Sequence, residues 1–433
     1  MDRRAANVAR RLGLGTTVVT LAVGIGCVTT TRNSAAMVDG RTALDEQLVR
    51  VALAIGVGDA RVTATSTWRV YESDGASIIA EADAGDVWHF QRAGRRVRAL
   101  APDGRATAYY DEPLVVRPAA WGGFAAHGGR RYRGELLIHA SDAGVTVVNQ
   151  LPIDEYLKGV VPMEIGEERT MAEFAAAEAQ AVAARSYAYV RLGGRADDRW
   201  YDLRPTVVDQ AYGGVDAETT VGTRAVESTA GLVLKYEGRV VNAPFHSTCG
   251  GTTAEAPEAW PVRGEPFLKR VSDRIPGSDR FYCDISPRFR WTRQLDGDRL
   301  EAVVSRYLRE YASVPTRGPG EVRAVAVTGR TGSGRVASLE IQTSRGGRYT
   351  LRGNDARFVL RAANGTILNS SWFDVESAAV TDGRVSRLVL RGAGYGHGVG
   401  MCQWGAIGRA RAGQDFRTIL ATYFPGTVVE PVF

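Results

Sequence analysis

The sequence is poor in cysteine and histidine, and beyond its first 26 residues it lacks any long apolar run. Its 433 residues include only four cysteines and five histidines. A membrane-spanning helix needs about 20 consecutive apolar residues, so the later chain offers no segment for one. Helix-turn-helix, zinc-finger and aromatic RNA-binding motifs are also missing. The net charge of +6 therefore favours an acidic polymer other than nucleic acid as the partner.

Length and composition are those of a globular protein with two or three domains. Hydrophobic residues make up 44% of the chain and charged residues 24%, which is enough apolar material for substantial cores. Fifty glycines and many short β-branched runs indicate a loop-rich protein. We predict an α+β fold with antiparallel β-rich domains packed around a central Ala-rich helix.

Patterns along the chain predict five segments. Residues 1–27 form an export signal, and the small, polar residues 28–43 form a linker. Alternation with period two predicts an N-terminal β domain over residues 44–130. We expect residues 131–256 to be the core with the central helix, and residues 257–433 to form an α+β part that completes a cleft.

The first segment combines a basic start with a short apolar stretch. Four arginines precede the run LGLGTTVVTLAVGIG, which ends directly before Cys27. Such a run is short for a membrane span and is typical of an export signal, and Gly26-Cys27 resembles a lipoprotein processing site. We predict a lipid anchor on Cys27 that holds the mature protein at the membrane, facing the cell envelope. Plain secretion is the alternative.

Residues 171–192 are predicted to form the central helix. Thr170 and Glu173 fit a capping box, and Gly193-Gly194 ends the run of strong helix formers. The many alanines leave little bulk on any face, so neighbouring backbone can approach closely. The polar residues among them are Gln180, Arg185, Ser186 and Tyr187. Because buried polar groups need partners, these residues either tie the helix to adjacent loops or face a ligand.

Glu164 lies between apolar neighbours just before this helix, in the run Pro162-Met163-Glu164-Ile165. Such surroundings raise the pKa of a carboxyl, as a general acid at neutral pH requires. Glu164 is therefore the candidate catalytic residue. The alternative is a solvated glutamate that the helix dipole stabilises.

Two loops with glycines are candidates for contact with a saccharide. In Asp209–Gly214 (DQAYGG), Gln210 and Tyr212 can hydrogen-bond and stack on a sugar while the backbone comes close. In Gly392–Gly405, six glycines surround His397. No Lys-Ser/Thr pair follows, so this second loop is not a phosphate loop. A plain turn and a structural histidine are the alternatives.

Three cysteines remain after export and lipidation. In an oxidising compartment, a Cys249–Cys283 disulfide is the first expectation. The alternative is a structural zinc site made by His246, Cys249 and Cys283, for which the His-x-x-Cys spacing is a weak signal. Cys402 is then a free thiol or a fourth ligand.

Five motifs in a fixed order carry a family resemblance. YLKGVVPMEI, AEAQAVAARSYAY, DQAYGG, FHSTCGG and GYGHGVGMCQWGA resemble the successive signatures of the stage II sporulation protein D family, which also contains amidase enhancers. The motifs span roughly residues 132–425. Two departures are local, because Ile165-Gly166 stands where the family usually has Met-Pro, and Cys402 stands where serine is common.

This resemblance implies a peptidoglycan lytic transglycosylase with Glu164 as general acid. It cleaves glycan strands, preferably stripped of stem peptides, between N-acetylmuramic acid and N-acetylglucosamine, and it leaves 1,6-anhydro ends without any required cofactor. The residues expected to hold the sugar or the Glu164 loop are Gln180, Arg185, Tyr187, Gln210, Tyr212, His246, Ser247, His397 and Gln403.

Two other functions remain open. One is a non-catalytic wall-binding protein that stimulates a cell-wall amidase, and its fold and basic surface would be the same. The other is a conventional hydrolase, which would use Asp209 or Glu155 as a second carboxylate.

Overall fold

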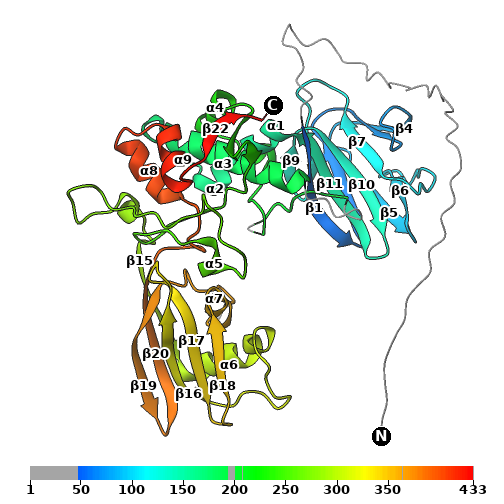
Figure 1. The fold of residues 1–433 in the computed structure, drawn as a ribbon. Coiled ribbons are helices and arrows are strands. Elements are labelled where there is room, and N and C mark those ends of the chain that lie inside the picture. The colour runs from blue at the N-terminus through cyan, green and yellow to red at the C-terminus, as the bar shows by residue number, and fades with distance from the viewer. Residues whose placement is uncertain (1–46, 194–199, 207, 363, 433) are drawn as a thin grey trace, which may run out of the picture. The chain divides into compact units, whose positions relative to one another are not determined.

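The computed structural model describes residues 47–193, 200–206, 208–362 and 364–432. The predicted signal peptide, the lipidation site Cys27 and the predicted linker lie outside the described residues. The described chain mixes helices with several antiparallel sheets, as predicted (Figure 1). Within it, no helix is both long enough and apolar enough to cross a membrane.

Eleven consecutive strands open the described chain. They are β1 (Leu48–Val57), β2 (Asp59–Ala64), β3 (Trp68–Tyr71), β4 (Ile78–Ala82), β5 (Trp88–Ala93), β6 (Arg96–Leu100), β7 (Leu114–Pro118), β8 (Ala125–His127), β9 (Arg130–Tyr132), β10 (Glu135–Ser141) and β11 (Gly144–Pro152). They form a six-stranded sheet, β1-β11-β10-β7-β3-β4, and a five-stranded sheet, β6-β5-β2-β8-β9. Alternate residues turn inward, as Val49 and Val51 of β1 do. Because β10 and β11 pair with β7 and β1, the first sheet continues past residue 130, the predicted end of the N-terminal domain.

A group of helices follows β11. It consists of α1 (Ile153–Lys158), α2 (Val161–Ile165), the 3₁₀ turn η1 (Met171–Glu173), α3 (Phe174–Gly193), the 3₁₀ turn η2 (Gly214–Ala217) and α4 (Thr220–Ser228). The capping box of Thr170 and Glu173 is present, although the first predicted helical turn is 3₁₀ and α3 itself begins at Phe174. Most alanines of α3 are buried, and α1, α2 and α4 pack against it.

Later segments of the chain also contact α3 and its neighbours. They include β12 (Leu232–Tyr236), β13 (Arg239–Val240), β14 (Phe245–His246), α5 (Ala256–Ala259), η3 (Tyr282–Ile285), β21 (Met401–Cys402), α8 (Gln403–Arg411), α9 (Phe416–Tyr423) and β22 (Val428–Pro431). Of these, α8, α9 and β12 pack on α3. β14 and β21 pair in parallel, with His246 opposite Cys402, so the FHSTCGG segment lies beside the Gly-rich loop. That β-rich domains surround α3 stays a prediction.

The residues between η3 and β21 build a second apolar core. Its elements are β15 (Arg290–Asp296), α6 (Gly297–Tyr307), the 3₁₀ turn η4 (Leu308–Glu310), β16 (Val322–Arg330), β17 (Val336–Thr343), β18 (Arg348–Arg352), α7 (Asp355–Val359), β19 (Phe373–Thr381) and β20 (Arg384–Ala393). The strands form two antiparallel sheets, β15-β20-β19 and β16-β17-β18. Leu300 and Val304 of α6 are fully buried here, in a cluster separate from the one that includes α3.

Candidate functional site

Glu164 lies on α2, a helix of five residues that begins with a proline in its first turn. Pro162 suits this place because its missing N–H would have no partner there. The helix ends at Gly166, whose φ of +106° is open to glycine and strained for other residues. Glu164 is half-buried, so α2 presents one carboxyl at a partly enclosed position.

Two hydrogen bonds from distant segments reach the Glu164 carboxyl. The backbone N–H of Ala211 donates to Oε1 over 2.6 Å, and the side chain of Gln403 at the start of α8 hydrogen-bonds to the carboxyl and lowers its pKa. The Gln403 amide in turn donates to Oε1 of Gln180 on α3, over 3.3 Å. Three segments that are far apart in the sequence therefore meet at one carboxyl.

Burial is the main influence on the acidity of Glu164. It raises the pKa of the carboxyl above its usual value, and the hydrogen bonds from Ala211 and Gln403 offset part of this rise. The net direction is upward, which keeps the proton on the carboxyl to a higher pH than in water. The electrostatics therefore suit a general acid, as the sequence predicts for this residue.

Glycines hold the Asp209–Gly214 loop against Glu164. The N–H of Gly213 donates to the carbonyl of Gly159 over 3.1 Å. Gly214 has a φ of +65°, and a Cβ there would lie 2.2 Å from the carbonyl oxygen of Arg131. Sequence reasoning missed the role of Ala211, because its donor is a backbone group. The two glycines were the available signal, since they mark a loop whose backbone is closely constrained.

Arg185 forms all its described hydrogen bonds inside the protein, and its predicted contact with sugar stays a prediction. It is fully buried, and its Nε donates to Oδ1 of Asp154 over 2.6 Å. Its two terminal nitrogens donate to the carbonyls of Leu232 and Val226, over 3.0 and 3.3 Å. Every nitrogen of the guanidinium is thus bonded inside the protein, and the residue ties α3 to α1, α4 and β12.

Gln210 and Tyr212 are also buried and bonded inside the protein, and their predicted contact with sugar stays a prediction. Gln210 accepts from the Tyr156 hydroxyl over 3.2 Å and donates to the carbonyl of Ala184 over 3.2 Å. The Tyr212 hydroxyl donates to Oδ1 of Asn149 over 2.8 Å. These side chains anchor the loop to the core, and the loop meets Glu164 with its backbone.

Tyr187 and Asp209 form a polar pair at the edge of this region. The Tyr187 hydroxyl donates to Oδ1 of Asp209 over 3.1 Å and accepts from Arg191 over 3.0 Å. Burial raises the pKa of Tyr187 to about 12, so the phenol is neutral. Asp209 also accepts the N–H of Arg204 over 3.0 Å. Nε of Arg191 also lies 3.7 Å from Oδ1 of Asp209, so two hydrogen-bond donors and one cation surround this carboxylate.

His397 is held by the backbone on both sides of its ring. Its Nε2 donates to the carbonyl of Phe245 over 2.9 Å, and its Nδ1 accepts the N–H of Val399 over 3.1 Å. Burial and the nearby Arg357 lower the pKa of His397 to about 3, so the ring is neutral. Among the described interactions, none joins His397 to Glu164. The structure therefore gives it a part in shaping the Gly-rich loop.

His246 and Ser247 also lie apart from Glu164 in the described interactions. His246 is buried, and its Nδ1 lies 3.1 Å from the carbonyl of Val399. Burial lowers its pKa well below the usual value. The half-buried Ser247 has its hydroxyl 3.4 Å from that of Thr248. Their predicted contact with sugar stays a prediction.

The three described cysteines converge in one buried cluster. Cys249, Cys283 and Cys402 are free thiols, and Sγ of Cys249 lies 3.4 Å from that of Cys283, so the expected disulfide is not formed in this structure. The ligand atoms of the three cysteines and of Asp273 lie within 4.8 Å of one another. This cluster could hold a metal ion. It differs from the predicted zinc site because Asp273 stands in place of His246.

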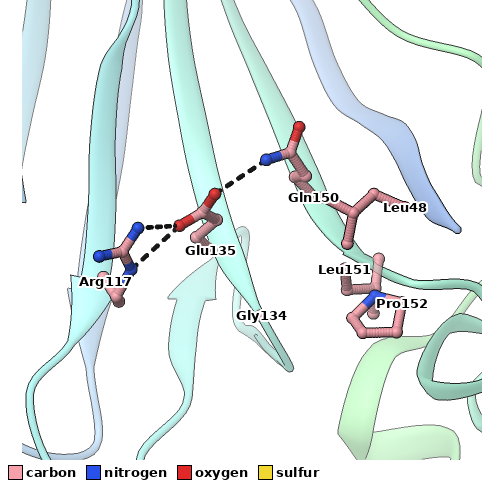
Figure 2. A pocket seen from close by; sticks show the side chains of 7 residues that line it. All are labelled: Leu48, Arg117, Gly134, Glu135, Gln150, Leu151 and Pro152. Carbon is pink, nitrogen blue, oxygen red and sulfur yellow. Dashed lines mark hydrogen bonds and ion pairs between the residues drawn. The ribbon is translucent and has the colours of Figure 1, made fainter. Parts of the chain in front are cut away.

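Two other carboxylates are neutralised by cations. Glu155 pairs with Lys158 over 2.7 Å and with Arg133 over 3.2 Å. Figure 2 shows a surface pocket at the ends of β1, β10 and β11, where Glu135 lies between Arg117 and Gln150, at 2.6 and 2.8 Å. The pocket is lined by Leu48, Arg117, Gly134, Glu135, Gln150, Leu151 and Pro152.

Comparison with known proteins finds relatives over much of the chain. Residues 141–236 match the family model described as Stage II sporulation protein, and residues 270–400 match a domain of unknown function. An uncharacterized protein of Brachyspira hyodysenteriae is 31% identical over 298 residues, which cover 69% of this chain and 72% of that protein. The family model covers Glu164, α3 and the Asp209–Gly214 loop.

Two relatives carry descriptive names. The amidase enhancer of Bacillus subtilis is 29% identical over 294 residues, which cover 63% of this chain and 40% of that protein. Stage II sporulation protein D of Bacillus subtilis is 28% identical over 300 residues, which cover 65% of this chain and 76% of that protein.

Proposed function

Since the chain belongs to the stage II sporulation protein D family, we propose that it is a peptidoglycan lytic transglycosylase. It cleaves glycan strands, preferably those without stem peptides, between N-acetylmuramic acid and N-acetylglucosamine. The observation that carries the proposal is the Glu164 carboxyl, whose pKa burial raises and which Ala211 and Gln403 hold in place.

Glu164 acts first as an acid and then as a base. The protonated carboxyl donates its proton to the glycosidic oxygen as the bond from that oxygen to C1 breaks. The resulting carboxylate accepts the proton of the C6 hydroxyl, whose oxygen attacks C1 and closes the 1,6-anhydro ring. One proton enters the leaving sugar and one returns to Glu164. Donation from Ala211 and Gln403 stabilises the carboxylate between the two steps.

The internal hydroxyl explains why one carboxyl is enough. A hydrolase of the usual kind needs a second carboxyl to activate water or to attack C1. The two candidates, Asp209 and Glu155, are already bound to cations and hydrogen-bond donors. The C6 hydroxyl needs no second carboxyl, because it is already positioned at the reacting carbon and Glu164 itself accepts its proton.

The proposed location rests on the N-terminal sequence, and the proposed partners rest on the substrate. The protein is exported to the cell envelope and anchored there through a lipid on Cys27, where it meets peptidoglycan and a cell-wall amidase. Cleavage by Glu164 needs no cofactor, so a metal bound by the cysteine cluster would be structural.

Mass spectrometry of purified glycan strands tests the proposal. Strands with and without stem peptides are incubated with the wild-type protein, with Glu164→Gln and with Glu167→Gln. Glu167 is an exposed carboxyl three positions away and serves as the matched control. We expect anhydro-muramyl products from the wild type and Glu167→Gln, and none from Glu164→Gln. Reducing ends in place of anhydro ends would show a hydrolase and contradict the mechanism.

A second candidate function is stimulation of an amidase without catalysis. The observation in its favour is the similarity to a protein named amidase enhancer. In this case neither strand is cleaved, the protein still binds wall sacculi, and it accelerates peptide release by an added amidase. Glu164→Gln would then leave the stimulation unchanged.

A further inference from the structure

The cysteine cluster lies outside the group of residues that contact Glu164, and it has the features of a metal site. We propose that Cys249, Asp273, Cys283 and Cys402 bind one zinc ion, and that the ion fixes the start of α8, from which Gln403 reaches Glu164. The zinc site stands on its own geometry. Only its effect on Glu164 rests on the proposed function.

The spacing of the ligand atoms fits a tetrahedral ion. Sγ of Cys249 lies 3.4 Å from Sγ of Cys283 and 3.4 Å from Oδ2 of Asp273, and all four ligand atoms lie within 4.8 Å of one another. A tetrahedral zinc with bonds of about 2.3 Å to sulfur holds its sulfurs about 3.8 Å apart. Small shifts of the side chains would suffice to bind the ion. All four residues are buried, as in closed structural sites.

Backbone N–H groups point at two of the sulfurs. The N–H of Cys249 lies 3.1 Å from Sγ of Cys402, and the N–H of Gly251 lies 3.3 Å from Sγ of Cys249. Cys402 is also the N-cap of α8 and accepts the N–H of Gly405 over 3.3 Å. Sulfur is a weak acceptor as a thiol and a better one as a thiolate. These N–H groups would stabilise the thiolates that form when a metal ion binds.

Hydrogen bonds hold the Asp273 carboxylate in an orientation that suits a metal ligand. Its Oδ1 accepts from the Tyr423 hydroxyl over 2.6 Å and from Nη2 of Arg409 over 3.1 Å. These bonds leave Oδ2 facing the sulfurs. Outer partners of this kind fix the rotamer of a ligating carboxylate. Gly405 makes room for the arrangement, since a Cβ there would lie 2.2 Å from Oδ2 of Asp273.

The charge of Arg335 provides an independent reason for a negative cluster. This arginine is almost fully buried, and its nitrogens donate to the carbonyls of Cys249 and Thr252 over 3.0 Å each. No carboxylate of the described chain forms an ion pair with it. An arginine stays charged in a protein interior, and a negatively charged cysteine cluster would, together with Glu258, attract Arg335. Zinc with three thiolates and one carboxylate has a net charge of −2, which Arg335 and Arg409 balance.

The same cluster determines where α8 begins. Cys402 comes from β21, Cys249 from the loop after β14, and Cys283 from η3, so one ion would clamp three segments together. Gln403 is the residue directly after Cys402, and its amide donates to Glu164 and to Gln180. Loss of the ion is therefore expected to loosen Gln403 and weaken catalysis without removing Glu164.

Metal analysis of the full chain tests the site directly. We expect about one zinc per chain by elemental analysis, as in structural sites. Replacement by Co²⁺ under reducing conditions should give an intense thiolate-to-cobalt absorption band in the near ultraviolet. Cys402→Ser should lose most of the bound zinc. Glu164→Gln should keep all of it, which separates failure of the zinc site from failure of the proposed function.

A milder pair of variants avoids the risk that a cysteine variant does not fold. Tyr423→Phe removes only the hydroxyl that orients Asp273, and we expect zinc affinity to fall about 10-fold to 100-fold. Tyr282→Phe is the matched control, since its hydroxyl contacts Gln414 and not Asp273. His246→Asn should keep its zinc, because His246 is not among the four ligands.

Two results would overturn the proposal. One is a chain that contains no zinc as purified and takes up neither Zn²⁺ nor Co²⁺ after reduction. The other is a mass two daltons below the reduced value with Cys249 and Cys283 linked in the peptide map, since that disulfide would consume two of the ligands. Equal zinc affinity of Tyr423→Phe and Tyr282→Phe would exclude Asp273 as an oriented ligand.

Discussion

Gln180 and Arg185 lie five residues apart on α3, and both are fully buried, yet their surroundings differ. All three nitrogens of the Arg185 guanidinium are bonded to Asp154 and to two backbone carbonyls. Gln180 accepts from Gln403, while its own amide nitrogen has no partner among the described residues. Burial alone therefore does not mark a functional side chain. The unused donor and the link to Glu164 distinguish Gln180.

The Asp209–Gly214 loop shows the same contrast within six residues. The side chains of Gln210 and Tyr212 form hydrogen bonds inside the core. The backbone N–H of Ala211, which lies between them, donates to Glu164. Side chains in this loop hold the position, and the backbone supplies the contact. Single substitutions can therefore separate residues that act at Glu164 from residues that hold the scaffold.

The largest effect is expected at Glu164 itself. Glu164→Gln should lower kcat/KM on glycan strands by about 10²–10⁴-fold, the range that a general acid contributes. Its carboxamide can still accept the N–H of Ala211, so the thermal midpoint should not fall. Activity is measured by release of anhydro-muramyl products and stability by thermal unfolding. Retention of most of the activity would place the acid elsewhere.

Arg185 should show the opposite pattern, a large loss of stability with little change in activity per folded molecule. Arg185→Leu leaves Asp154 and two carbonyls without their buried partner, and breaking such a pair costs about 3–5 kcal/mol of unfolding free energy. Denaturant unfolding measures the loss. Arg239→Leu, at an exposed position on β13, is the control and should change stability little. An intact Arg185→Leu fold with a raised KM would restore Arg185 to the binding site.

Much of the site was predictable because distant motifs carry the residues that meet. Glu164, Gln180 and Gln403 were all named from the sequence, and the structure brings them together. The capping box at Thr170 also follows from local sequence alone, because its partners lie three residues apart. The capping box can be predicted because it depends on residue type and short spacing, whereas Gln403 was named through the family resemblance.

What could not be predicted depends on partners from other segments. Arg185 is bonded inside the protein because it contacts Asp154 of α1. Tyr212 is held in the same way, by its hydrogen bond to Asn149 of β11. Ala211 acts through its backbone, which no side-chain pattern reveals. Asp273 has no motif of its own, and only the fold brings it to the sulfurs while His246 turns to Val399.

A moderate effect is expected at Tyr212. Tyr212→Phe removes the hydroxyl and leaves Oδ1 of the buried Asn149 unpartnered, which costs about 1–3 kcal/mol. Because the ring remains, KM for glycan strands should not change. Chemical denaturation and steady-state kinetics measure the two quantities. A rise in KM at unchanged stability would instead indicate contact between Tyr212 and the sugar.

The smallest and most specific effect is expected at Gln403, which positions Glu164 and stabilises its carboxylate. Gln403→Ala removes a hydrogen-bond donor that lowers the pKa of Glu164. The rise caused by burial is then less offset, so the pKa of Glu164 increases further. The acid must be protonated to act, and activity is lost as pH rises through that pKa. The alkaline limb of kcat/KM should therefore move to higher pH, while the rate at its maximum falls by less than about tenfold, the worth of one hydrogen bond.

The control for this shift is Gln414→Ala, which removes an amide just beyond the end of α8 that contacts Tyr282 and Arg409. It can disturb α8 without touching Glu164, so its pH profile should match the wild type. If both variants lose activity equally with unshifted profiles, then Gln403 belongs with Arg185 in the scaffold. An alkaline limb that moves to lower pH in Gln403→Ala would mean that the amide stabilises the protonated acid, since the pKa of Glu164 would then have fallen.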